Sequence, residues 1–250
     1  MHDVVAFSES QDLAAAEGNV AGVPDDHITV NGDDIVVGPN NMIIGALACV
    51  GTNGTRARIV SPSLRRVNTL DIRPLTLALF AGDIAGFRMF PTSPIALETY
   101  ESMQCLFTAD PAAAEQETCV LFTAPGAIAP ISGKIYPVRF SWTRALLAGQ
   151  WANSGINLID DLPNGNYTVV GASLVAATGI AFRFVPVGAA SRPGGIVQQT
   201  VDNMQHPAFR FGGLGAWFDF NTVMLPSMDV IASAAAGAAT YFGTMDVMAK

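Results

Sequence analysis

Residues 42–59, MIIGALACVGTNGTRARI, and residues 168–184, TVVGASLVAATGIAFRF, follow almost the same course. Each stretch passes from β-branched or aliphatic residues through Gly-Ala, crosses an apolar run, and reaches a Gly turn. Each then ends in alternating arginine and apolar residues. Alternation with a period of two, in β-branched residues, is typical of half-buried strands. We therefore expect each stretch to fold as strands of a sheet.

The similarity extends along most of the chain. Gly45-Ala46 and Gly171-Ala172 are 126 residues apart, and other matches follow in the same order at separations between 122 and 127 residues. They are Asp33-Asp34 with Asp160-Asp161, Pro39-Asn40 with Pro163-Asn164, Arg58 with Arg183, Arg66 with Arg192, Phe87-Arg88 with Phe209-Arg210, and Met103 with Met228. Loop insertions after a tandem duplication would produce such drifting separations. We predict two similar domains, residues 1–125 and 126–250.

The rest of the sequence indicates an all-β fold with few short helices. Short segments rich in Val, Ile, Thr, Phe and Tyr, such as 134–142 and 216–225, are separated by Asn-Gly and Pro-Asn turns. Three alanine-rich segments, 10–18, 109–117 and 227–239, could each form two helical turns. We expect each domain to be a Greek-key sandwich or jelly-roll barrel with seven or eight strands, because closure limits exposed sheet edges.

The composition indicates a surface that is poor in charge. Charged residues make up 14% of the chain, against about 25% in an average soluble domain. The net charge is −8, and the lysines are Lys134 and Lys250. Much of the surface could meet other protein, or it could be the polar, uncharged exterior of a secreted or surface protein. No run of Lys or Arg appears, so we expect no direct binding of nucleic acid.

The residues that carry metal chemistry are few and scattered. His2, His27 and His206 are far apart, which disfavours the clustered histidines of a metal-dependent cupin. The three cysteines, Cys49, Cys105 and Cys119, form no CxxC pair and are expected to be buried free thiols. We predict no metal site and no cofactor.

Catalytic motifs are equally scarce. The Gly-rich stretch 209–217, FRFGGLGAW, is not a P-loop, and no GxSxG motif occurs. The pairs Asp33-Asp34 and Asp160-Asp161 mark turns, bind calcium weakly through loop oxygens, or do acid–base work. We predict that the protein is not an enzyme and has no catalytic residue.

The first residues, MHDVVAFSESQDLAAAEGN, have no basic segment followed by a long apolar one. This pattern differs from a secretory signal peptide. We expect synthesis in the cytoplasm.

Two tandem β-barrels with little charge and no catalytic motif resemble the double jelly-roll major capsid proteins of icosahedral viruses. That family includes tectivirus-like phages and adenovirus hexon. The resemblance lies in architecture and in the duplicated Gly-Ala pattern. It implies a homotrimer that self-assembles into the shell of a virion, together with minor capsid or penton proteins and with an internal membrane as a further partner.

The resemblance also implies where copies would touch. Arg-bearing and aromatic loops at 65–73, 87–90 and 209–217 would anchor the contacts between subunits. The residues we select as assembly contacts are Arg66, Arg73, Phe90, Arg192, Arg210 and Trp217. The alternatives are a carbohydrate- or surface-binding β-sandwich, such as a viral fibre or lectin-like module, and an enzyme on a β scaffold that uses the Asp pairs.

Overall fold

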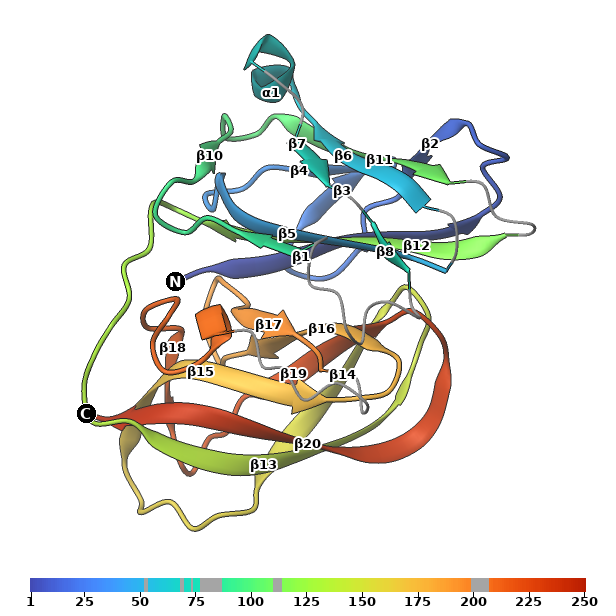
Figure 1. The fold of residues 1–250 in the computed structure, drawn as a ribbon. Helices are drawn as coiled ribbons and strands as arrows, with labels where there is room; N and C mark the ends of the chain where they lie inside the picture. The colour runs from blue at the N-terminus through green and yellow to red at the C-terminus, as the bar shows by residue number, and fades with distance from the viewer. Residues whose placement is uncertain (52–53, 68–69, 73, 77–86, 110–113, 199–206) are drawn as a thin grey trace. The chain divides into compact units, whose positions relative to one another are not determined.

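The computed structural model describes residues 1–51, 54–67, 70–72, 74–76, 87–109, 114–198 and 207–250. They form two compact units (Figure 1). The N-terminal unit consists of residues 5–127 and 148–150, and the C-terminal unit of residues 1–4, 128–147 and 151–250. Each unit therefore includes a short segment from the other half of the sequence.

The N-terminal unit contains one short helix and strands that are mostly short. Its elements are β1 (Asp3–Gln11), β2 (Glu17–Val20), β3 (Thr29–Asn31), β4 (Asp34–Val36), β5 (Met42–Val50), β6 (Gly54–Val60), α1 (Pro62–Val67), β7 (Leu70–Ile72), β8 (Leu75–Thr76), β9 (Phe87–Met89), β10 (Ile95–Ala96), β11 (Ser102–Ala109) and β12 (Glu115–Ala124). The first two residues of β1 belong to the C-terminal unit.

The strand order of the N-terminal unit is that of a jelly roll. In one sheet the last strand, β12, lies between β1 and β5, and β5 also pairs with β8, β9 and β10. In the other sheet β11 lies between β2 and β6, with β4 on the β2 side and β7 beyond β6. Strands from the end of the unit are thus inserted between strands from its beginning, as two Greek keys require.

The C-terminal unit repeats this order. Its elements are β13 (Tyr136–Leu146), β14 (Trp151–Leu158), β15 (Asn166–Val175), β16 (Gly179–Val185), β17 (Gly194–Ile196), η1 (Pro207–Phe209), β18 (Phe218–Asn221), β19 (Ser227–Ala232) and β20 (Ala236–Ala249). The strand order is β17-β16-β19-β14-β13-β20-β15-β18. Here β20 lies between β13 and β15, and β19 between β14 and β16, so the two units share one topology.

Some of the matched residues of the sequence fall on equivalent strands of the two units, whereas Phe87 lies in β9 and Phe209 in η1. Gly45 lies in β5 and Gly171 in β15, which are both neighbours of the last strand of their unit. Arg58 and Arg183 lie in β6 and β16, which occupy corresponding places in their units. Shared topology is what a duplication would leave, and the duplication itself stays a prediction.

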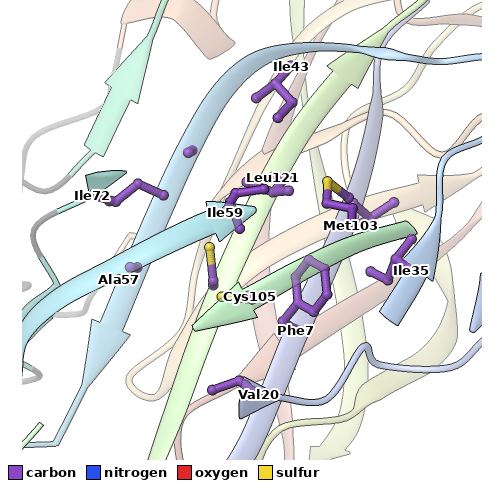
Figure 2. Packing of buried hydrophobic residues seen from close by; sticks show 14 of the residues in the cluster. Phe7, Val20, Ile35, Ile43, Ala57, Ile59, Ile72, Met103, Cys105 and Leu121 are labelled. Carbon is purple, nitrogen blue, oxygen red and sulfur yellow. The ribbon is translucent and has the colours of Figure 1, made fainter. Parts of the chain in front are cut away.

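The core of the N-terminal unit gathers buried side chains from both of its sheets. Figure 2 shows the N-terminal core, where Phe7, Ile59 and Leu121 from three strands pack with Met103 and Cys105 of β11. Along β11 buried and half-buried side chains alternate without a break, as the period of two predicts. Burying each large apolar side chain contributes roughly 1.5–3 kcal/mol.

The alanine-rich segments expected to be helical are not helices in the described residues. Segment 227–239 forms β19 and the start of β20, and segments 10–18 and 109–117 contribute to strands at both ends. Short isolated helices are marginal in water, whereas these segments gain cross-strand partners. The helices α1 and η1 were not predicted from the sequence. None of the described helices is long and apolar enough to cross a membrane.

Candidate functional site

Trp217, one of the six predicted assembly contacts, is part of the C-terminal core. Its side chain has no exposed surface. The ring of His2 meets it edge-on with centroids 4.9 Å apart, and Phe182 lies 6.5 Å away. The burial of this ring is therefore explained within the unit, and the part of Trp217 in assembly stays a prediction.

Arg210 is buried together with an acidic partner, Asp246. Its Nε and Nη2 atoms donate to the two carboxylate oxygens of Asp246, on β20, at 2.7 and 2.9 Å. Asp246 also accepts from the backbone N–H of Phe211 at 2.9 Å. A bidentate, buried pair of this kind holds a loop against a strand. Arg210 therefore fixes the 209–217 loop within one chain, and its part in assembly stays a prediction.

Arg192 belongs to a second buried network. Its guanidinium lies 3.4 Å from the carboxylate of Asp229, which Arg183 contacts at 2.9 Å. Arg183 is completely buried, donates to the carbonyl of Val4 at 3.0 Å, and lies 4.0 Å from the ring of Trp151. The partial burial of Arg192 is therefore explained within the unit, and its part in assembly stays a prediction.

The other selected residues are Phe90, Arg66 and Arg73. Phe90 is partly buried against the N-terminal core. Arg66 lies in α1, but its side chain is outside the described residues, as is the whole of Arg73. Their roles in assembly remain predictions.

The first residues of the chain are bound within the C-terminal unit. His2 is buried, and its Nε2 lies 2.8 Å from the carbonyl oxygen and 3.0 Å from the amide nitrogen of Gly194. Burial lowers the pKa of His2 to about 4, although the Gly194 hydrogen bond and the charge of Asp3 oppose the shift. Asp3 accepts from the backbone N–H of Arg192 at 2.9 Å. His2 is therefore a neutral, structural histidine at neutral pH.

The acidic pairs lie in separate units and have structural partners. Asp33 accepts from Asn19 at 3.1 Å, and Gln104 donates to Asp34 at 3.3 Å. Arg139 donates to Asp160 through its side chain and backbone, which lowers the pKa of that carboxyl. Within the described ranges, no three His, Cys, Asp or Glu side chains gather as metal ligands would.

The N-terminal unit contains the three cysteines and an unusual carboxyl. Cys49, Cys105 and Cys119 are buried free thiols, as predicted, and burial raises the pKa values of Cys49 and Cys105. Burial also raises the pKa of Glu117 to about 7, with Glu9 and Glu115 adding to the effect. Gln11 donates to one oxygen of Glu117 at 2.7 Å, which opposes the shift.

Exposed apolar side chains occur on loops that were not predicted as assembly contacts. The expected strand 216–225 ends at Asn221, so Val223 and Met224 lie in the following turn and are 81% and 57% exposed. Val187, in the loop after β16, is 68% exposed. The sequence shows that segment 216–225 is apolar, and this pattern predicts one continuous strand. It does not show that the strand ends at Asn221.

The similarity of this chain to known proteins is weak. No family model and no curated protein matches the chain. Among solved structures, the major capsid protein P2 from bacteriophage PM2 matches with 10% identity and a TM-score of 0.26, over 100% of this chain and 97% of that one. A Paenibacillus xanthan lyase matches with 10% identity and a TM-score of 0.20, over 99% of this chain and 25% of that one. Similarity at this level carries no argument about function, which has to come from the chain's own geometry.

Proposed function

We propose that this chain is a structural subunit of a virion shell, which forms trimers that tile an icosahedral capsid. The observation that carries the proposal is the presence of two units with one jelly-roll topology in a single chain. Three such chains place six similar units around one axis. That outline is close to sixfold, and it packs against copies of itself without gaps.

The distribution of charge supports the proposal. Only 14% of the residues are charged, and six of the charged residues in the described ranges are buried. They are Asp3, Glu117, Arg183, Arg210, Asp229 and Asp246. Their burial leaves the surface still poorer in charge, which lowers the desolvation cost of contacts between copies.

The structure offers the two alternative functions less support. Exposed aromatic side chains in the described residues include Tyr100 in the N-terminal unit and Phe211 and Phe242 in the C-terminal unit. They come from different loops and strands, whereas a sugar-binding face stacks neighbouring aromatics beside polar side chains. The carboxylates proposed for acid–base work, Asp33 and Asp160, are in different units.

Light scattering on the purified chain tests the proposal. We expect a species about three times the 26.2 kDa chain mass, or larger, over a broad range of protein and salt concentrations. A stable, dispersed monomer under all these conditions would contradict it. Binding of a monomer on a glycan array would instead favour the carbohydrate-binding alternative.

A further inference from the structure

The turn between β18 and β19 presents apolar side chains to solvent. Val223 is 81% exposed and Met224 57% exposed. Exposed turns are usually built from Gly, Asn, Asp and Ser, whose backbone or side chains satisfy the turn. Two large apolar residues at such a position need another explanation than turn formation.

The polar groups of the same turn form hydrogen bonds within the turn and to the loop before β15. Asn221 accepts from the backbone N–H of Val223 at 3.0 Å through its side-chain oxygen, and donates to Asn166 at 2.8 Å. The hydroxyl of Thr222 accepts from the backbone N–H of Gly165 at 3.1 Å. The turn is thus fixed to the loop before β15 by its own polar groups. Little further ordering would be needed when Val223 binds a partner.

The loop after β16 also presents apolar side chains to solvent. Val185, the last residue of β16, pairs with Ser227, the first residue of β19. The loop after Val185 and the turn before Ser227 therefore leave the sheet at neighbouring positions. In that loop Val187 is 68% exposed, and Ala189 and Ala190 are exposed too. We call Val187, Ala189, Ala190, Val223 and Met224 the apolar turn patch.

The two loops of the patch contain very little charge. Residues 186–193 and 222–226 include one charged residue, Arg192, whose guanidinium is directed to Asp229. The chain as a whole has a net charge of −8, so two copies repel each other wherever acidic surfaces meet. A contact between copies costs least where the surface is apolar and uncharged. The absence of a basic residue from the patch disfavours an anionic lipid surface as its partner.

We propose that the apolar turn patch is a docking surface for a second copy of this chain. The proposal rests on the proposed shell function, and it names where one contact of the assembly is made. Val223 and Met224 are the anchors, because they are the most exposed large side chains of the rigid turn. Methionine is enriched at the cores of interfaces, and a few central, well-packed residues usually carry most of the binding energy.

The test is sedimentation velocity on the double variant Val223→Asp/Met224→Asp. We expect its self-association to be at least about tenfold weaker than that of the unaltered chain, since two anchors are replaced by repelling charges. The matched control is Ala235→Asp/Ala238→Asp, which adds the same charge at exposed positions of β20 and the loop before it. The control should associate like the unaltered chain. Circular dichroism would show that both variants are folded.

The outcomes separate the two proposals. If the unaltered chain is an oligomer and the turn variant associates equally well, the docking surface is overturned and the shell function stands. Equal weakening in both variants would also overturn it, because the effect would not belong to the patch. A monomeric unaltered chain would contradict the shell function and the docking surface together. Binding of the chain to zwitterionic phosphatidylcholine vesicles that is lost in the turn variant would assign the patch to lipid instead.

Discussion

The backbone N–H of Gly212 donates a hydrogen bond to the carbonyl of Val170 at 2.8 Å. Val170 is the bulged residue of β15, because the register with β20 skips it between Val169 and Gly171. The bulge turns this carbonyl away from the hydrogen bonds between β15 and β20, so it accepts a hydrogen bond from the 209–217 loop instead. A bulge that redirects a backbone group in this way is a built feature of the sheet.

The N-terminal unit contains the same arrangement. Ile44 is skipped in the register between β5 and β12, and its carbonyl accepts from the backbone N–H of Phe90 at 2.7 Å. Ile44 and Val170 are 126 residues apart, and Phe90 and Gly212 are 122 apart. These are the separations of the Gly-Ala and Phe-Arg matches in the sequence. The agreement favours a tandem duplication as the origin of the two units.

The glycine that follows the bulge should not tolerate a side chain. A Cβ at Gly171 would lie 2.8 Å from the carbonyl oxygen of Phe209 and 2.9 Å from the Cα of Arg210. We expect Gly171→Ala to lower the free energy of unfolding by about 2 kcal/mol, because backbone atoms must move. Urea denaturation followed by tryptophan fluorescence measures this, since all three tryptophans lie in the C-terminal unit. Gly155→Ala, in open space on β14, is the control and should change little.

Removing one partner of the ion pair between Arg210 and Asp246 should destabilise the C-terminal unit more than replacing both partners with apolar residues. Arg210→Met leaves the buried carboxylate of Asp246 without its partner, and we expect a loss of about 3 kcal/mol in the free energy of unfolding. The double variant Arg210→Met/Asp246→Leu removes both charges and should recover most of the loss. A double variant as unstable as the single one would show that the pair itself stabilises the unit.

Glu117 should make the N-terminal unit less stable as the pH rises. Its pKa in the folded protein is about 7, above the ordinary value of 4.5, so the folded state binds more protons between these values. The stability of the unit therefore falls as pH increases through this range. We expect Glu117→Gln to raise the free energy of unfolding by about 2 kcal/mol above neutral pH and to flatten the pH profile.

The three cysteines provide the measurement for this prediction. They all lie in the N-terminal unit, so the rate of thiol modification in increasing denaturant reports the unfolding of that unit. The control is Glu98→Gln, at an exposed position before β11. A Glu117→Gln variant that keeps the slope of the unaltered chain would show that Glu117 does not titrate as stated.

His2 should give the C-terminal unit the opposite dependence. Its pKa is lowered to about 4 from 6.5, so the unfolded chain binds more protons between these values and stability is lost on acidification. In His2→Phe the hydrogen bond to Gly194 is lost, at a cost of about 1 kcal/mol near neutral pH. The acid-induced loss should disappear from the tryptophan-detected transition. His27→Asn, in the N-terminal unit, should leave that transition unchanged, and persistence of the acid loss in His2→Phe would refute the assignment.

The buried thiols should be inert in the folded protein. Cys49, Cys105 and Cys119 have at most 1% of their surface exposed, so a reagent in solution cannot reach them. Burial also raises the pKa values of Cys49 and Cys105, which disfavours the reactive thiolate at these two residues. An aromatic disulfide reagent should modify none of them within minutes in native buffer and all three after denaturation. Rapid labelling of the native protein would show that the N-terminal unit opens readily.

The strands could be predicted because the alternation of apolar and polar residues along a segment follows the alternation of buried and exposed side chains in a strand. In β6 the buried Ala57 and Ile59 alternate with the less buried Arg56 and Arg58, as the pattern predicts. In β16 the same alternation fails, because Arg183 is buried together with its apolar neighbours. Its partner Asp229 is on β19, 46 residues away in the sequence, so no local pattern could show the pair.

The candidate surface was harder to predict than the fold. Trp217 and Arg210 have the chemistry of interface anchors, yet contacts with His2 and Asp246, far apart in the sequence, bury them in one chain. Val223 and Met224 continue an apolar segment, and the end of the strand at Asn221 depends on that residue's bonds to the turn and to Asn166. Such cross-loop bonds are set by the tertiary fold.

Electron microscopy of the purified oligomer examines the shell proposal most directly. Class averages should show trimers whose outline has six lobes of similar size, one for each jelly-roll unit. Particles with two, four or five lobes, or a uniform field of single 26.2 kDa chains, would contradict it.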